Sequence, residues 1–237
     1  MNTLIKMEAN RRGVTRICHF TPSRNLVHIA SGFTGVLATK KLQNDERTVF
    51  TPTDLLRLDK HEGYISCSIE YPNAWYFDKA QAKDILFKDW VVLLINPKYL
   101  WRDGTLFCPR NAASDYGAGI GKGPDAFNAL YADSVQGAYG KVRSRSTNHL
   151  PSCPTDQQAE VLIPDQILLD DISGVVVSSD IQAKNEVSRF KYLSVAPNRF
   201  RLIVAPILFD KYTLSRYIQS GKRPSEAVWT SGAKNER

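Results

Sequence analysis

The stretch Asp156-Gln-Gln-Ala-Glu160-Val-Leu-Ile-Pro164 combines a short apolar run with a glutamate at the start of that run. A run of this length, rich in branched aliphatic side chains, is typical of a strand inside a sheet. Glu160 is then the first residue of the strand. A glutamate there is either an ordinary surface residue or the acid of a catalytic site, and the rest of the sequence has to decide between the two.

The chain has 237 residues, of which 43% are hydrophobic and 23% charged, so it can bury a sizeable core. It contains no run of about 18 apolar residues, so we expect no membrane span, and its first residues lack the apolar segment of a signal peptide. The four cysteines are far apart and form no Cys-x-x-Cys pair. That spacing argues against a zinc site and is typical of reduced thiols, so we expect a cytoplasmic protein without a metal.

The formal charge of +7 is unevenly distributed along the chain. Residues 189–237 contain ten Lys or Arg and three acidic residues, which leaves the remainder close to neutral. Two basic stretches stand out in that remainder. They are formed by Lys6, Arg11, Arg12, Arg16 and Arg24 and by Lys141, Arg143 and Arg145. Such stretches suit a polyanion such as nucleic acid, and a solvated basic surface is the alternative that charge alone leaves open.

Hydrophobic periodicity and turn residues predict a mixture of strands and helices. The expected strands are residues 15–20, 64–69, 90–95, 105–108, 160–163, 172–177 and 201–205, the last at a sheet edge. The expected helices are residues 23–30, 72–83, 180–190 and 209–220. We therefore expect one α+β domain over residues 1–237, with a basic C-terminal extension at 191–229 and a disordered tail at 230–237.

Residues 111–158 show no clear periodicity, and half of the fourteen glycines lie between positions 104 and 140. The run Gly117-Ala-Gly-Ile-Gly121-Lys-Gly123 is similar to a phosphate-binding loop, but its glycine spacing is too short and no Ser or Thr follows the lysine. No helix clearly follows it either. We therefore expect a mobile, functional loop with a glycine hinge.

Four short blocks occur in an order that resembles the DarT family of NAD-dependent DNA ADP-ribosyltransferase toxins. The blocks are Cys18-His-Phe-Thr21 with Asn25-Leu26, Ser66-Cys-Ser-Ile69 with Tyr71-Pro-Asn73, Phe107-Cys-Pro-Arg-Asn111, and Gln158-Ala-Glu160-Val-Leu-Ile-Pro164. The similarity covers about residues 14–190. The second block resembles the branch of the family that modifies guanine.

The resemblance implies an ADP-ribosyltransferase fold, with two small sheets around an NAD cleft and helices at the periphery. It implies that Glu160 is the catalytic carboxylate and that Arg57 is the active-site arginine, with Arg47 as the competing candidate. It also implies a set of residues that hold NAD. These are His19, Thr21, Asn25, Tyr76 and Asn111.

The glycine-rich loop is then the DNA-binding segment. Lys141, Arg143 and Arg145 are expected to contact phosphates, together with Arg47, and aromatic side chains are expected to stack on unpaired bases. The aromatic candidates are Tyr116, Phe127, Tyr131 and Tyr139.

These expectations combine into a function. The chain is expected to transfer ADP-ribose from NAD to a base of single-stranded DNA, with guanine favoured, as the toxin partner of a macrodomain antitoxin. Transfer to RNA or to protein is one alternative. A non-catalytic nucleic-acid-binding module of the same fold is the other, and substitution of Glu160 distinguishes it.

Overall fold

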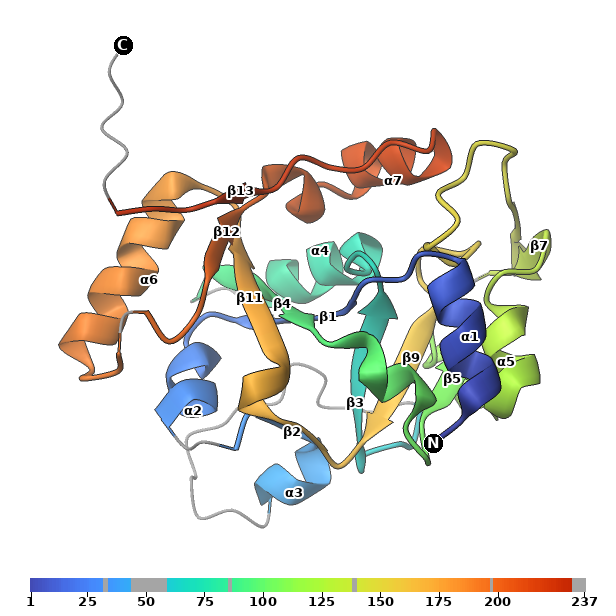
Figure 1. The fold of residues 1–237 in the computed structure, drawn as a ribbon, viewed down its shortest axis with the longest axis horizontal. Coiled ribbons are helices and arrows are strands. Elements are labelled where there is room, and N and C mark those ends of the chain that lie inside the picture. Colours follow the sequence, from blue (N-terminus) through green and yellow to red (C-terminus); the bar gives the residue numbers. More distant parts are fainter. Residues whose placement is uncertain (32–33, 44–58, 85–86, 138–139, 197, 232–237) are drawn as a thin grey trace.

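The computed structural model describes residues 1–31, 34–43, 59–84, 87–137, 140–196 and 198–231 (Figure 1). Arg47, Arg57, Tyr139 and most of the tail expected to be disordered lie outside these residues. Within the described ranges, no helix combines the length and apolarity needed to cross a membrane.

The described strands form one large sheet in the order β13-β12-β11-β4-β1-β3-β9-β5-β6. Their bounds are β1 (Ile17–Pro22), β3 (Tyr64–Ile69), β4 (Trp90–Ile95), β5 (Leu106–Cys108), β6 (Gly121–Lys122), β9 (Glu160–Pro164), β11 (Ile172–Val177), β12 (Leu202–Val204) and β13 (Ala227–Val228). Two further pairs lie outside it. They are β2 (Val36–Leu37) with β10 (Gln166–Ile167), and β7 (Ser134–Gln136) with β8 (Val142–Ser144).

The large sheet divides between β1 and β3. Strand β1 pairs with β4 along its whole length, from Ile17 to Pro22, but it pairs with β3 only at Ile17 and Cys18. Beyond that point β1 continues with β4, whereas β3 continues with β9. The two small sheets that were expected are therefore the two halves of this sheet, joined at the start of β1.

Seven α-helices are described around the sheet (Figure 1). They are α1 (Thr3–Arg11), α2 (Asn25–Ser31), α3 (Thr39–Gln43), α4 (Ala74–Lys83), α5 (Gly123–Ala129), α6 (Asp180–Tyr192) and α7 (Lys211–Gln219). Short 3-10 segments are η1 (Pro97–Trp101), η2 (Ser114–Gly117), η4 (Leu169–Asp171) and η5 (Pro206–Phe209). The mixed α+β class is confirmed.

Strand β4 explains why the core has two sides. All six of its residues are buried. Val91 and Leu93 belong to the apolar cluster that contains residues of α1, α2, α5 and α6, and Val92 belongs to the cluster that contains residues of α4 and α7. Because successive strand residues point to opposite faces, a strand covered on both faces needs the continuous apolar run seen in the sequence.

Several sequence-based expectations were wrong. The edge assignment of residues 201–205 fails because β13 pairs with β12. The expected glycine hinge contains the whole of β6, in which Gly121 pairs with Phe107, and α5 begins at Gly123. Helix α1 was not expected at all. It buries Ile5 and Ala9, too few apolar positions for a clear helical pattern.

Candidate active site

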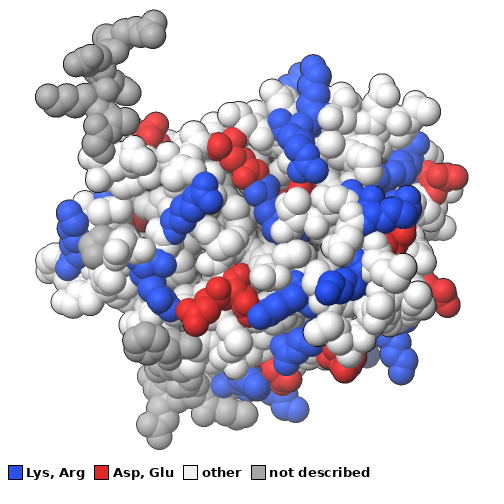
Figure 2. Space-filling model, viewed as in Figure 1, with Lys and Arg blue, Asp and Glu red and all other residues white. Residues whose placement is uncertain are grey.

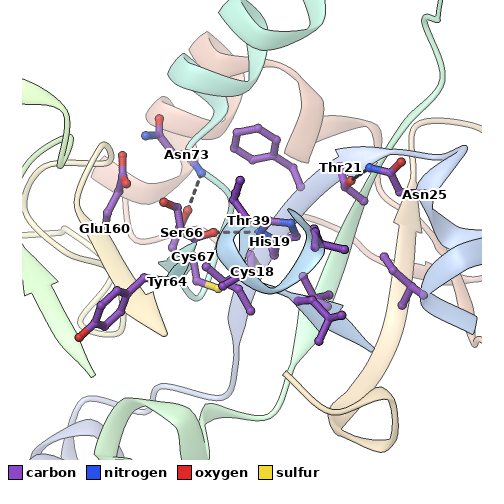
Figure 3. Close-up of a pocket in the computed structure, with 18 of the residues that line it drawn as sticks. Cys18, His19, Thr21, Asn25, Thr39, Tyr64, Ser66, Cys67, Asn73 and Glu160 are labelled. Atoms are coloured by element: carbon purple, nitrogen blue, oxygen red, sulfur yellow. Dashed lines mark hydrogen bonds between the residues drawn. The ribbon is translucent and has the colours of Figure 1, made fainter. Parts of the chain in front are cut away.

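A cavity lies where the two halves of the sheet separate (Figure 3). Its walls come from β1, α2, the segment 34–42, β3, the start of α4, and the residues Asn111 and Glu160. The wall at 34–42 depends on Gly35, which has a φ of +71° and whose added Cβ would lie 2.1 Å from the carbonyl oxygen of Ile167. A glycine is therefore required where this segment crosses the end of β10.

Glu160 begins β9, opposite Cys108 of β5, and is 8% exposed. Its Oε1 accepts a hydrogen bond of 2.8 Å from Nδ2 of Asn111. The amide of Asn111 is itself oriented, because its Oδ1 accepts from the backbone N–H of Ala113 at 3.1 Å. The Glu160 carboxylate therefore has a hydrogen-bond donor in a fixed position, on the turn that follows β5.

The thiols around Glu160 are not suited to act as nucleophiles. Burial, together with the charge of the nearby Glu160, raises the pKa of Cys108 to about 11 and that of Cys67 well above its ordinary value. Only the thiolate is strongly nucleophilic, so at neutral pH these side chains are inert. Among the described residues, the groups suited to chemistry in the cavity are therefore its carboxylate, imidazole, hydroxyl and amide groups.

His19 spans the gap between the two halves of the sheet. Its Nδ1 lies 2.9 Å from the carbonyl oxygen of Ser66 on β3. A carbonyl oxygen can only accept, so Nδ1 carries the hydrogen, and in the neutral ring Nε2 is an acceptor. The bond fixes the ring where β1 has already separated from β3.

The other residues expected to hold NAD lie in the same cavity. Nδ2 of Asn25 donates to Oγ1 of Thr21 at 2.8 Å, and both side chains are buried. Tyr76 lines the cavity from α4. Figure 3 shows Thr21 and Asn25 at one end, Glu160 at the other and His19 between them. The structure thus brings together six predicted residues that are widely separated in the sequence.

The two arginine candidates cannot be located, because Arg57 and Arg47 lie outside the described residues. Asp59, which follows Arg57 closely, lines the cavity.

The predicted DNA-binding residues divide into two groups. Lys141 and Arg143 are exposed on the β7–β8 hairpin. Arg145 instead donates hydrogen bonds of 2.8 Å to the carbonyls of Cys153 and Leu150, and its guanidinium lies over the Tyr131 ring. Its observed contacts therefore hold the loop together.

Two of the aromatic expectations were wrong. Phe127 and Tyr131 are 0% and 5% exposed and pack in the core, where they cannot stack on a base. Phe127 contacts the Phe107 ring edge-on. Tyr116 remains available, since it is 72% exposed. Tyr139 lies outside the described residues.

The N-terminal basic stretch is largely neutralised by acidic partners. Arg11 and Arg12 pair with Glu8, and Arg16 pairs with Glu226. On the face drawn in Figure 2, acidic side chains lie at several places among the more numerous basic ones. The fold therefore uses much of the positive charge of that stretch in ion pairs.

Asn73 and Ser68 line the cavity, and the sequence did not single them out as site residues. Asn73 is the N-cap of α4 and accepts from the backbone N–H of Tyr76 at 3.0 Å. The preference for Asn at N-caps could have identified it as the cap. Its place in the cavity depends on the separation of β1 from β3, for which the sequence has no signal.

Comparisons with known proteins identify relatives of this chain. Residues 18–203 match the family model described as ssDNA thymidine ADP-ribosyltransferase, DarT. The solved structure of Thermus sp. 2.9 DarT in complex with ADP-ribosylated ssDNA is 14% identical, with a TM-score of 0.57, over 84% of this chain and 97% of that one. No curated protein matches the sequence.

A second solved structure is Thermosipho africanus DarTG in complex with ADP-ribose, at 14% identity and a TM-score of 0.53. The match covers 82% of this chain but 51% of the Thermosipho chain, so the present chain spans about half of that relative. At these identities the two structures establish the shared fold. The family model covers well over half of the sequence, and the chain therefore belongs to the DarT family.

Proposed function

We propose that this protein transfers ADP-ribose from NAD to a base of single-stranded DNA, with Glu160 as the catalytic carboxylate. The observation that carries the proposal is the buried carboxylate of Glu160, held by Asn111 at one end of a cavity that His19, Thr21 and Asn25 also line. The elongated spread of these groups supports a dinucleotide lying along the cavity, with its nicotinamide ribose at the Glu160 end.

The chemistry requires a negative charge at that end. The bond between ribose C1′ and the nicotinamide nitrogen breaks, and its electron pair leaves with nicotinamide. A nitrogen of the accepting base forms the new bond to C1′ and loses a proton, which Glu160 or water takes up. The positive charge that develops on the ribose is stabilised by a carboxylate in a fixed position, by on the order of 3 kcal/mol.

The residues that line the cavity fit this substrate. His19 and Thr21 are proposed to contact the nicotinamide and its ribose, and Asn25 is proposed to lie toward the adenosine. Tyr76 and Asn111 complete the proposed set. Arg57, with Arg47 as the alternative, is proposed as the arginine that contacts a phosphate and supports the accepting base.

The identity of the accepting base is a separate part of the proposal. The description of the matched family names thymidine as the base that is modified, whereas the block from Ser66 to Asn73 resembles the guanine-modifying branch. We retain guanine as the favoured base, with thymidine as the alternative. The β7–β8 hairpin supplies Lys141 and Arg143 as exposed phosphate contacts for the DNA strand.

The family and one relative support a proposal for the biological role. A DarTG chain from Thermosipho africanus shares the fold. We propose that the present protein is likewise the toxin of a toxin–antitoxin pair, and that its antitoxin is a macrodomain protein similar to DarG.

The test uses NAD labelled in its adenylate half and offers single-stranded DNA, RNA and a polypeptide as acceptors. We expect label on the DNA. Label on RNA or polypeptide alone selects the alternative transferase. Glu160→Ala is expected to abolish labelling while folding and DNA binding persist, and labelling at the wild-type rate by this variant contradicts the assignment.

A further inference from the structure

We propose that the side-chain amide of Asn73 is a substrate-binding group, which donates to the 3′-hydroxyl oxygen of the nicotinamide ribose beside Glu160. The inference rests on the proposed use of NAD. It assigns a contact to a residue that otherwise only caps a helix.

The orientation of the Asn73 side chain is fixed by the helix that it begins. Its Oδ1 accepts from the backbone N–H of Tyr76 at 3.0 Å, as an N-cap does. Its own backbone N–H donates to Oγ of Ser68 at 2.9 Å. With the oxygen of the amide held by the cap, Nδ2 has to point away from α4.

The position of Asn73 relative to Glu160 follows from the register of the strands. Cys67 is paired with Val161, and antiparallel pairing continued by one residue sets Ser68 opposite Glu160. Since Ser68 holds the backbone of Asn73, the start of α4 lies at the Glu160 end of the cavity. Figure 3 agrees, because the Asn73 amide nitrogen lies on the side that faces Glu160.

Within the part of the chain that the structure describes, the amide nitrogen of Asn73 has no hydrogen-bond partner, although the residue is only 2% exposed. A buried donor without a partner costs about 1–3 kcal/mol, so such groups are rare in folded proteins. The residue lines the same cavity as Glu160 and His19. An acceptor supplied by a ligand in the cavity removes this cost, which makes the amide a binding group for that ligand.

The chemistry of the pair points to a sugar diol. A carboxylate that stabilises positive charge on the ribose, as proposed for Glu160, is ionised and can only accept, whereas Nδ2 of Asn73 can only donate. Two neighbouring hydroxyls need both functions, because each gives one hydrogen and offers lone pairs. The 2′-hydroxyl is adjacent to the C1′ whose charge Glu160 is proposed to stabilise, so this hydroxyl is assigned as the donor to Glu160. The 3′-hydroxyl oxygen is then the next acceptor along the ribose, and Asn73 supplies its donor.

The test distinguishes the proposed donor function of the Asn73 amide from its function as the N-cap of α4. Asn73→Ser and Asn73→Asp both keep a side-chain oxygen for the Tyr76 N–H but remove the amide NH2, and the shorter serine hydroxyl does not reach the position of Nδ2. Asn96 offers a matched control, because its Oδ1 caps η1 at Lys98 and it does not line the cavity. We expect Asn73→Ser to weaken NAD binding about three- to tenfold, as for loss of one uncharged hydrogen bond, with a melting temperature near that of the wild type. Asn96→Ser is expected to bind NAD with wild-type affinity.

Binding is measured by calorimetry without DNA, with NAD and with an analogue that lacks the 3′-hydroxyl of the nicotinamide ribose. The analogue is expected to bind wild type and Asn73→Ser equally, because the two deletions remove the same bond. Wild-type NAD affinity in both Asn73 variants overturns the proposal, and so does an equal loss of affinity for NAD and for the analogue. If Asn73→Ser behaves as expected but no DNA is modified, the contact stands and the proposed transfer fails.

Discussion

The hydrogen bond from Asn111 to Glu160 gives the sharpest quantitative prediction about the active site. It joins a neutral amide to a buried carboxylate at 2.8 Å. Hydrogen bonds to charged groups contribute about 1.5–3 kcal/mol. If Asn111→Ala loses that contribution in the transition state, ADP-ribose transfer slows by roughly ten- to 150-fold, since about 1.4 kcal/mol corresponds to a factor of ten.

The assay is the single-turnover rate of transfer to a single-stranded oligonucleotide, at saturating NAD. Two variants separate the contact from the local turn. Asn111→Ala loses both the bond to Glu160 and the turn bond from Ala113, whereas Asn111→Asp keeps an acceptor for Ala113 and loses the donor. We therefore expect Asn111→Asp to be at least as slow as Asn111→Ala, because it sets a second carboxylate against Glu160.

A rate within about twofold of the wild type for Asn111→Asp would refute this reasoning, because the predicted loss is at least roughly tenfold. Unchanged circular dichroism and melting temperature serve as the control for folding. A variant that unfolds is replaced by Asn111→Ser, which retains a hydroxyl for the turn.

Other regions of the molecule give further expected outcomes. Lys141→Ala with Arg143→Ala should weaken binding to single-stranded DNA and lower the slope of log affinity against log salt by about 1.4, as for two phosphate contacts, and an unchanged slope removes the hairpin from the DNA contact. Arg145→Ala should instead leave that slope unchanged and destabilise the fold by about 2 kcal/mol in urea unfolding, because its guanidinium holds the Leu150 and Cys153 carbonyls. Burial raises the pKa of Asp156, so the folded state keeps that proton to higher pH than the unfolded state and loses stability as the pH rises between the two pKa values. Asp156→Asn should therefore melt above the wild type at neutral pH, and a melting difference that does not shrink toward acid pH would contradict this.

The strands at the centre of the fold were readable from the sequence because their patterns have no competing interpretation. Residues 90–95 are six apolar side chains without a breaker, and the predicted bounds agree with β4. The strand that starts at Glu160 was also predicted correctly. Both strands are central in the sheet, where burial on both faces demands apolar residues.

The sequence did not predict which strands pair with one another across long distances along the chain. The separation of β1 from β3 after Cys18 creates the cavity, yet neither strand carries a local signal for it. The same holds for α5. This helix begins with Gly123-Pro124 and buries only Phe127, so its sequence shows no clear helical pattern. Its stability comes from packing against β5, which the sequence does not reveal.

The prediction that the basic stretches bind a polyanion was partly wrong for a similar reason. Arg16 and Arg145 belong to basic stretches in the sequence, but their partners Glu226 and the Leu150 carbonyl are known only from the fold. Lys141 and Arg143 remain available as predicted, because both side chains are exposed on the β7–β8 hairpin. Counting charges along a chain therefore overestimates the surface that is free to bind a polyanion.

Mass spectrometry of mixed-sequence single-stranded DNA after incubation with NAD tests the central claim most directly. The account predicts that one kind of base gains the mass of ADP-ribose with wild-type protein, and that Glu160→Gln leaves the DNA unmodified. Unmodified DNA with the wild type, or equal modification by Glu160→Gln, would contradict it.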